Sequence, residues 1–165
     1  MEIEHSEQVF VSDITYIKRD HGHAYLAPVT DAYSKKLMSW ALDDNMKATL
    51  VVQALGIAIK NLKFKPKSII YHSDRAIQYC CPEFTGFANK NNFLLSTTQQ
   101  YDPYENAVAE RVNGILKYEF GLKKIIKNVH IAKQLMKQAT LIYNKEYTGV
   151  LDWKLLNIFT INITR

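Results

Sequence analysis

Three acidic residues lie where an acidic side chain is locally unfavourable, and they are the first candidates for chemistry. Asp13 falls inside "QVFVSDITYIK" (8–18), a run of β-branched and aromatic residues in which Asp is disfavoured. Asp74 ends the apolar run "SIIYHSD" (68–74), and the carboxyl end of a buried strand is a usual place for ligand binding in open α/β sheets. Glu110 lies in the helical pattern of "YDPYENAVAERVNGILK" (101–117). Taken singly, each acid has a structural explanation, as a solvent-facing edge residue, a turn cap and a surface residue.

Taken together, the three acids predict a site for divalent metal ions. Carboxylates gathered around one point repel each other unless cations lie between them. Hard oxygen ligands select Mg²⁺, and Mn²⁺ can substitute for it. Two such ions about 3.5–4 Å apart activate an attacking hydroxyl and stabilise the leaving oxygen of a phosphodiester. We therefore expect Asp13, Asp74 and Glu110 to be both the metal ligands and the catalytic residues of a nucleotidyl transfer, with two ions.

The helix that carries the third acid has a strongly specified start. Asp102 is a candidate N-cap, Pro103 fits the first helical position, and Glu105 completes a capping box. Spacings of three, four and seven residues fall on one face of a helix. In this segment that face carries Glu110, Asn113, Gly114 and Lys117. The fixed start is expected to hold the carboxylate at a set depth over the sheet and to place the lysine where a phosphate can reach it.

The elements that must position these residues are predicted from hydrophobic periodicity. Strands are expected at 8–18, 24–31, 37–42, 68–74 and 92–96, with the first three joined by short turns as an antiparallel meander. Helices are expected at 47–60, 82–91, 102–117 and 128–147. Strands followed by alternating helices and strands give an α/β fold in which helices flank a mixed sheet. The sequence contains no glycine-rich phosphate-binding motif, so nucleotide binding has no support.

Size and composition fit one globular domain that lies outside membranes. The chain has 165 residues, of which 47% are hydrophobic and 22% charged. No apolar run approaches the roughly 20 residues of a membrane span. The first ten residues do not resemble a secretory signal, and Cys80 and Cys81 are neighbours without zinc-type spacing. A reducing cytoplasm is the expected location.

The net charge of +5 is concentrated in one segment. Between 117 and 137 there are six lysines against one acid, Glu119. An excess of this kind suits a polyanionic partner such as DNA. A solvated lysine-rich helix face explains the same pattern equally well.

Three segments together resemble the integrase-type catalytic core of bacterial insertion-sequence transposases, a family related to retroviral integrases. They are "VSDITYI" (11–17), "HSDRAIQY" (72–79) and "DPYENAVAERVNGILK" (102–117). The family has an acidic triad of Asp, Asp and Glu with 35 residues before the Glu, and 35 residues separate Asp74 from Glu110. The resemblance covers about residues 7 to 147. It implies an RNase H-like fold with a five-stranded mixed sheet of order 3-2-1-4-5.

The resemblance also implies an activity, which is Mg²⁺-dependent DNA strand cleavage and strand transfer. The triad carries over to Asp13, Asp74 and Glu110, and the family's helix lysine to Lys117. The implied partners are element-end DNA, target DNA and further copies of the chain in a homo-oligomer, in the nucleoid-associated cytoplasm of a bacterium. Further DNA contacts are expected from Lys123, Lys124, Gln99 and Gln100.

Some positions depart from the family pattern. Ala76 stands where the family usually has Gly, and an Ala held at positive φ would strain the loop after Asp74. The pattern is lost after Asn144, so a catalytic core at 1–147 and a divergent tail at 148–165 are expected. No helix-turn-helix precedes the core, which predicts that a separate partner polypeptide recognises the element ends.

Two other functions remain open from the sequence. The first is an RNase H-type nuclease, which would hydrolyse an RNA–DNA hybrid without joining strands. The second is a decayed or repurposed DNA-binding module that keeps the fold and has lost catalysis. Metal binding separates the second from the other two.

Overall fold

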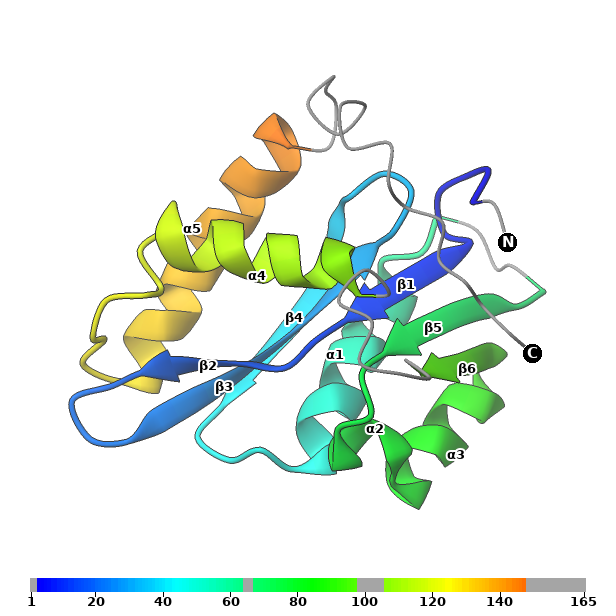
Figure 1. The fold of residues 1–165 in the computed structure, drawn as a ribbon, viewed down its shortest axis with the longest axis horizontal. Coiled ribbons are helices and arrows are strands. Elements are labelled where there is room, and N and C mark those ends of the chain that lie inside the picture. Colours follow the sequence, from blue (N-terminus) through cyan, green and yellow to red (C-terminus); the bar gives the residue numbers. More distant parts are fainter. Residues whose placement is uncertain (1–2, 64–66, 98–105, 148–165) are drawn as a thin grey trace.

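The computed structural model describes residues 3–63, 67–97 and 106–147. In these ranges one sheet is flanked by helices (Figure 1). The strands are β1 (Val9–Ser12), β2 (Thr15–Lys18), β3 (His23–Asp31), β4 (Leu37–Asp43), β5 (Ile69–Ser73) and β6 (Phe93–Thr97). The helices are α1 (Ala48–Lys60), α2 (Ile77–Cys80), α3 (Pro82–Lys90), α4 (Ala107–Tyr118) and α5 (Val129–Glu146).

The first predicted strand is divided into two. The expectation of one strand over 8–18 is wrong at Asp13 and Ile14, which separate β1 from β2. Both pieces pair antiparallel with the single long strand β3. The backbone carbonyl of Asp13 accepts a hydrogen bond from the side chain of Asn113 rather than from a neighbouring strand. This side-chain contact replaces the regular ladder where the chain changes from β1 to β2.

The strand order agrees with the predicted fold. Tyr25 of β3 pairs with Tyr16 of β2 and also with Asp43 of β4, so β4 must lie along the other edge of β3. Beyond β1 come β5 and β6, both in parallel register. Counting β1 and β2 as one divided strand, the predicted mixed sheet of order 3-2-1-4-5 is confirmed.

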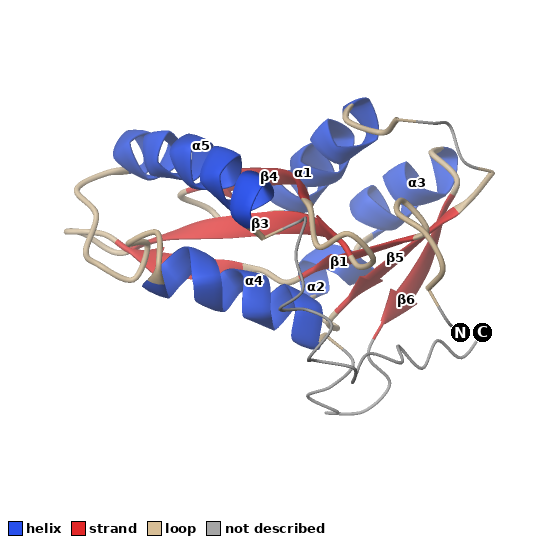
Figure 2. Ribbon diagram, turned by 90° about the horizontal axis from the view of Figure 1, so that it is seen from above, coloured by secondary structure: helices blue, strands red, loops and turns tan. Residues whose placement is uncertain are grey.

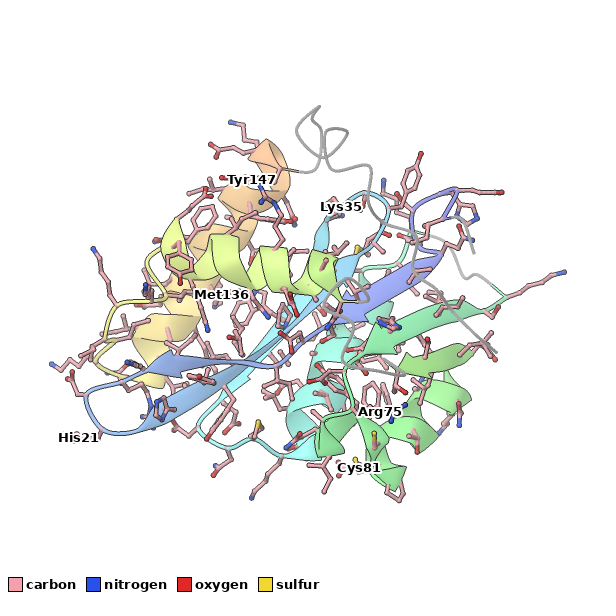
Figure 3. The ribbon with its side chains drawn as sticks, viewed as in Figure 1. His21, Lys35, Arg75, Cys81, Met136 and Tyr147 are labelled. Atoms are coloured by element: carbon pink, nitrogen blue, oxygen red, sulfur yellow. The ribbon has the colours of Figure 1, made fainter. Side chains whose placement is uncertain are left out.

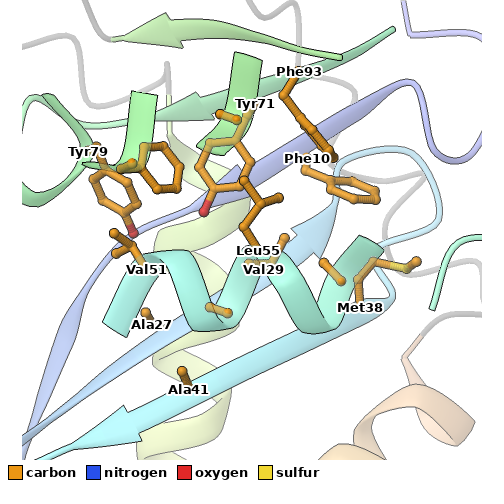
Figure 4. Close-up of a cluster of buried hydrophobic side chains, with 14 of the residues drawn as sticks. Phe10, Ala27, Val29, Met38, Ala41, Val51, Leu55, Tyr71, Tyr79 and Phe93 are labelled. Carbon is orange, nitrogen blue, oxygen red and sulfur yellow. The ribbon is translucent and has the colours of Figure 1, made fainter. Parts of the chain in front are cut away.

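Helices cover the sheet on two faces, as Figure 2 shows from above. On one face, the buried side chains of α1 and α3 pack with residues of β1, β3 and β5, including Phe10, Val29 and Tyr71 (Figure 4). On the other face, α4 and α5 cover a second cluster that contains Ile17 and Leu26. Successive residues of a strand point to opposite faces, which lets one short strand supply both layers.

Most predicted element boundaries are within a residue or two of those observed. The helix expected at 128–147 is α5, and the Asn128 side chain caps it by accepting from the backbone N–H of Ile131. The hairpin turn expected at 19–23 contains Gly22 at φ +80°, a conformation that favours glycine. The short helix α2 was not predicted. None of the helices in the described ranges combines the length and apolar character of a membrane span.

Several sequence predictions fall outside the described residues. They concern the capping box of Asp102, Pro103 and Glu105, the loop residues Gln99 and Gln100, and the tail at 148–165. The described part of the catalytic-helix candidate, α4, begins at Ala107 after Asn106.

Candidate active site

Two of the three candidate acids leave neighbouring parallel strands at the same level. Ser12 of β1 is the register partner of Ser73 of β5, and each is followed directly by an Asp. Asp13 and Asp74 therefore emerge side by side at the carboxyl end of the sheet, and both are half-buried. The predicted placement on adjacent strands is confirmed. Because parallel strands end at a common edge, this end of the sheet can gather polar groups from several elements.

The third acid is brought to this edge by two asparagine contacts between α4 and β1. The side-chain amide of Asn106, just before α4, donates to the carbonyl oxygen of Ser12 at 3.3 Å. Further along the same side of α4, the amide of Asn113 donates to the carbonyl oxygen of Asp13 at 3.1 Å and to its carboxylate Oδ2 at 3.0 Å. Both asparagines are 6% exposed. Glu110 lies between them in the first turn of α4, with an exposed side chain.

The pKa of the Asp13 carboxyl group is affected by several residues of the site. Its pKa is raised from 3.8 to about 6, mainly by burial and then by the negative charge of Asp74. The charge of Glu110 raises it further, while the hydrogen bond from Asn113 and the ammonium group of Lys117 lower it. Burial is thus the main cause of the rise at Asp13, and repulsion from the other two acids adds to it. All four neighbours act on one carboxyl group, so these residues form one electrostatic unit.

The loop after Asp74 is unstrained. Ala76 has φ −59° and ψ 140°, a conformation that any residue adopts. Its backbone N–H donates to Asp74 Oδ1 at 3.1 Å, which helps to orient that carboxylate. The expectation that Ala76 strains this loop is therefore wrong. The backbone does not enter the positive-φ region there, so glycine is not required.

A buried hydroxyl pair supports the strand end beneath the acids. Ser12 Oγ donates to the carbonyl oxygen of Pro28 at 2.7 Å, so the hydroxyl of Tyr79, also 2.7 Å away, is the donor to Ser12. Tyr79 belongs to α2, and burial raises its pKa well above the ordinary value. This contact ties the segment that follows Asp74 to the strand that precedes Asp13.

The predicted basic residues lie at the far end of α4. Lys117 Nζ is 5.0 Å from the centroid of the Tyr16 ring, and Lys123 Nζ is 4.3 Å from that of Tyr118. Lys117 is close enough to the acids to lower the pKa of Asp13. Lys123 and Lys124 are exposed in the turn that follows the helix. The structure therefore joins Lys117 to the acidic site and leaves the other two lysines on the surface beyond it.

The sequence interpretation gave no role to Asn106, Asn113 or Ser12. For Asn113 a signal was available, because it shares a helical face with Glu110 and Lys117. For Asn106 and Ser12 there was none, since their partners are 94 and 67 residues away along the chain. Tyr79, at the end of the segment that contains Asp74, also contacts the site through its hydroxyl.

The donor set suits a hard divalent cation. Carboxylate oxygens are the ligands that Mg²⁺ and Mn²⁺ prefer, and the charges of Asp74 and Glu110 both act on the Asp13 carboxyl group. In the described ranges, no group of three or more His, Cys, Asp or Glu side chains is already arranged to hold an ion. The fit of these residues to a divalent cation therefore rests on two points: their carboxylate oxygens suit such an ion, and the elements that carry them meet at the carboxyl edge of the sheet.

The mixed sheet, with acids at the ends of neighbouring parallel strands and on a crossing helix, defines an RNase H-like, integrase-type core. Two sequence families, both described as integrase core domain, match residues 4–103 and 92–147. The chain belongs to the integrase core domain family.

Curated relatives are insertion-sequence proteins of bacteria. The transposase for insertion sequence element IS629 of Shigella sonnei is 31% identical over 125 residues, which is 76% of this chain and 42% of the relative. Transposase InsF for insertion sequence IS3A of Escherichia coli strain K12 is 34% identical over 112 residues, covering 68% of this chain and 38% of the relative. The chain thus spans about two fifths of the length of these relatives.

Solved structures share the fold at low sequence identity. The HTLV-2 integrase catalytic core domain in complex with magnesium, in its dimeric form, has a TM-score of 0.65 and 18% identity, over 88% of this chain and 90% of that one. The Mos1 transposase catalytic domain with raltegravir and Mg has a TM-score of 0.68 and 13% identity, over 86% of this chain and 75% of that one. These similarities establish the RNase H-like architecture.

Proposed function

We propose that this chain is the catalytic core of a transposase and carries out divalent-metal-dependent DNA strand cleavage and strand transfer. The observation that supports this most is the electrostatic unit around Asp13, in which Asp74 and Glu110 both raise the pKa of one carboxyl group. Family membership supports it independently. Two structural neighbours were solved with magnesium, which is consistent with use of the same ion here.

In this proposal Asp13, Asp74 and Glu110 are the catalytic residues and would hold two Mg²⁺ ions, with Mn²⁺ as a substitute. The ions, when bound, would promote ionisation of the attacking hydroxyl and neutralise charge that develops on the phosphodiester. Exposed side chains change rotamer readily, so Glu110 can adjust to complete the ligand set. The hydrogen bond from Asn113 favours the anionic form of Asp13, which is the form that binds cations.

The chemistry proceeds in two displacements at phosphorus. In the first, water attacks a phosphodiester, a new P–O bond forms, and the bond to the 3′-oxygen breaks to leave a free 3′-OH. In the second, that 3′-OH attacks a phosphodiester of target DNA and displaces the 3′-oxygen there. The protein's part is positioning and charge, because α4 and β1 hold the acids at a fixed edge and Lys117 supplies a cation for a phosphate.

The partners and the extent of the unit are part of the same proposal. The core at 1–147 would act on element ends and on target DNA as a homo-oligomer, with a helix-turn-helix polypeptide providing end recognition. The lysines Lys117, Lys123 and Lys124, together with Gln99 and Gln100, would contact DNA. The setting would be the nucleoid of a bacterial cytoplasm.

Incubation with a supercoiled plasmid and a labelled oligonucleotide that ends in a free 3′-OH tests both displacements. With Mn²⁺ or Mg²⁺ we expect weak nicking with little sequence preference, together with joining of the label to the plasmid. Chelation of the metal should abolish both reactions. Hydrolysis of an RNA–DNA hybrid without joining would identify a nuclease instead. Metal-independent DNA binding with neither reaction would identify a non-catalytic module.

A further inference from the structure

An exposed aromatic ring lies on β2, the strand that begins two residues after Asp13. In this strand Thr15 and Ile17 are buried, while Tyr16 is 58% exposed. Tyr16 follows Asp13 by three residues, which in an extended chain is roughly 10 Å. Among the named strands β2 pairs with β3, and at its end the Lys18 carbonyl accepts from the backbone N–H of Ile126 at 2.9 Å, so the exposed ring lies on an edge strand of the sheet.

Two neighbours hold this ring. Lys117 Nζ from α4 is 5.0 Å from the ring centroid, and the His23 ring of β3 meets it edge-on at 5.5 Å. The same lysine lies close enough to Asp13 to lower its pKa. We call the group formed by Tyr16, His23 and Lys117 the Tyr16 platform. It combines an exposed aromatic surface, a restricted ring and a cation, at the site where a phosphodiester would be cleaved.

We infer that the Tyr16 platform binds an unpaired nucleotide of the DNA substrate, with its base stacked on the Tyr16 ring and a neighbouring phosphate on Lys117. The inference rests on the proposed function and deepens it by naming the form of DNA that the site receives. Bases inside a duplex already stack on each other, so only an unpaired base offers a free face to a protein ring. Stacking is tolerant of sequence because every base has such a face.

The alternative role of Tyr16 is to hold the Lys117 side chain in place. The two roles differ in the DNA that they favour. A lysine that contacts phosphate strengthens binding to any DNA, paired or unpaired. A stacking ring strengthens binding only where a base is free.

Binding is therefore measured by fluorescence anisotropy with a blunt duplex and with the same duplex carrying a short unpaired overhang. Divalent metal is omitted so that no cleavage occurs. The unmodified chain should prefer the overhang. Tyr16→Ala should reduce affinity for the overhang duplex about fivefold or more, the lower end of what one stacked base contributes, and leave the blunt duplex unchanged. Tyr16→Phe keeps the ring and should keep the preference.

Two variants act as controls. Tyr33→Ala removes a tyrosine of similar exposure, 51%, from the β3–β4 turn at the other end of β3, and it should leave both affinities unchanged. Lys117→Ala should weaken binding to both duplexes alike. Thermal unfolding of each variant checks that the fold is retained.

The inference is overturned if Tyr16→Ala weakens both duplexes equally, which assigns the ring to holding Lys117, or if it changes neither. It is also overturned if the unmodified chain binds both duplexes equally well. Failure of the chain to bind any DNA would instead count against the proposed function. Loss of cleavage alone, with the overhang preference intact, would count against the metal chemistry and leave the inference standing.

Discussion

The two ends of strand β1 both bury acidic side chains, and they differ in what surrounds those acids. At the amino end, Asp31 of β3 pairs with Phe10 and is 1% exposed. Its carboxylate accepts from the backbone N–H of Tyr33 at 3.2 Å and from Ser34 Oγ at 2.6 Å. Burial lowers the pKa of Lys35, and the charge of Asp31 partly offsets that effect. The acid at this end is enclosed by donors and a cation from its own turn.

At the carboxyl end, burial and then the charge of Asp74 raise the pKa of Asp13 to about 6. Asp13 faces two other carboxylates, and its side-chain donor comes from a helix a hundred residues away along the chain. Figure 3 marks the separation of the two ends, with Lys35 at the β3–β4 turn and Arg75 beside Asp74. The two ends therefore differ in the charges that act on the acid, which come from a lysine at the amino end and mainly from other carboxylates at the carboxyl end.

Removing one acid from each end should separate the two roles most sharply. Asp74→Asn should lower DNA nicking by about two to three orders of magnitude or more, because it removes a carboxylate ligand of the proposed metal ions, which neutralise charge on the reacting phosphate. Asp31→Asn at the other end should retain most of the activity at a temperature where it stays folded. The plasmid assay measures both. Equal losses in the two variants would remove the distinction between the ends.

The asparagine contacts offer a second comparison, between α4 and α5. Asn113 bridges α4 to Asp13, and Asn144 bridges α5 to the backbone N–H and carbonyl of Leu37 at 2.9 and 3.1 Å. Replacement of either by Ala leaves buried backbone groups unpaired and should cost about 1–3 kcal/mol of unfolding free energy. Only Asn113→Ala should also reduce nicking, by about tenfold, because the carboxylate loses its orientation. A matching activity loss in Asn144→Ala would make the effect one of stability.

At the amino end, the expected change is in stability. Asp31→Asn exchanges a charged acceptor for a neutral one, and hydrogen bonds to charged groups are worth about 1–2 kcal/mol more than neutral ones. We expect the free energy of unfolding to fall by about that amount in a denaturant titration. An unchanged or increased stability would show that the hydrogen bonds of Asp31 do not offset the cost of burying its charge.

The smallest effect concerns stability against pH at the carboxyl end, measured without metal. The pKa of Asp13 is raised on folding from 3.8 to about 6, so the folded state binds this proton more tightly than the unfolded state. The ionised side chain therefore destabilises the fold above about pH 6, and the penalty disappears as the pH falls below 3.8. Asp13→Asn should raise the unfolding temperature at pH 8, at about 2–4 °C for each kcal/mol of stability gained.

That gain should shrink as the pH is lowered through 6 and be absent below pH 3.8. Unfolding temperatures of both proteins over this range provide the check. A gain that is independent of pH, or one that grows on acidification, would contradict the assigned cause.

The sequence was sufficient for the parts of this structure that depend on local pattern. Periodicity located the helices α1, α3 and α5 and the edges of β5 and β6, because each buries one regular stripe or run. Asp13 was singled out as an acid inside a strand pattern, and Asp74 as an acid at the end of an apolar run. Each of these features can be recognised from a few residues that are neighbours in the sequence.

The rest depends on contacts between distant segments. The break between β1 and β2 is made by the amide of Asn113, and the hydroxyl pair of Ser12 and Tyr79 joins residues 67 positions apart. No window of sequence contains both partners. The strain expected at Ala76 failed for a related reason, since the backbone conformation there is set by its contact with Asp74 and not by residue type.

The central claim is that the acids at the carboxyl end form a divalent-cation site and those at the amino end do not. The rise in unfolding temperature on addition of Mn²⁺ tests this directly, because a ligand that binds only the folded state stabilises it by mass action. We predict a concentration-dependent rise for the unmodified chain and for Asp31→Asn, and little or none for Asp74→Asn. The same rise in Asp74→Asn as in the unmodified chain would contradict the account.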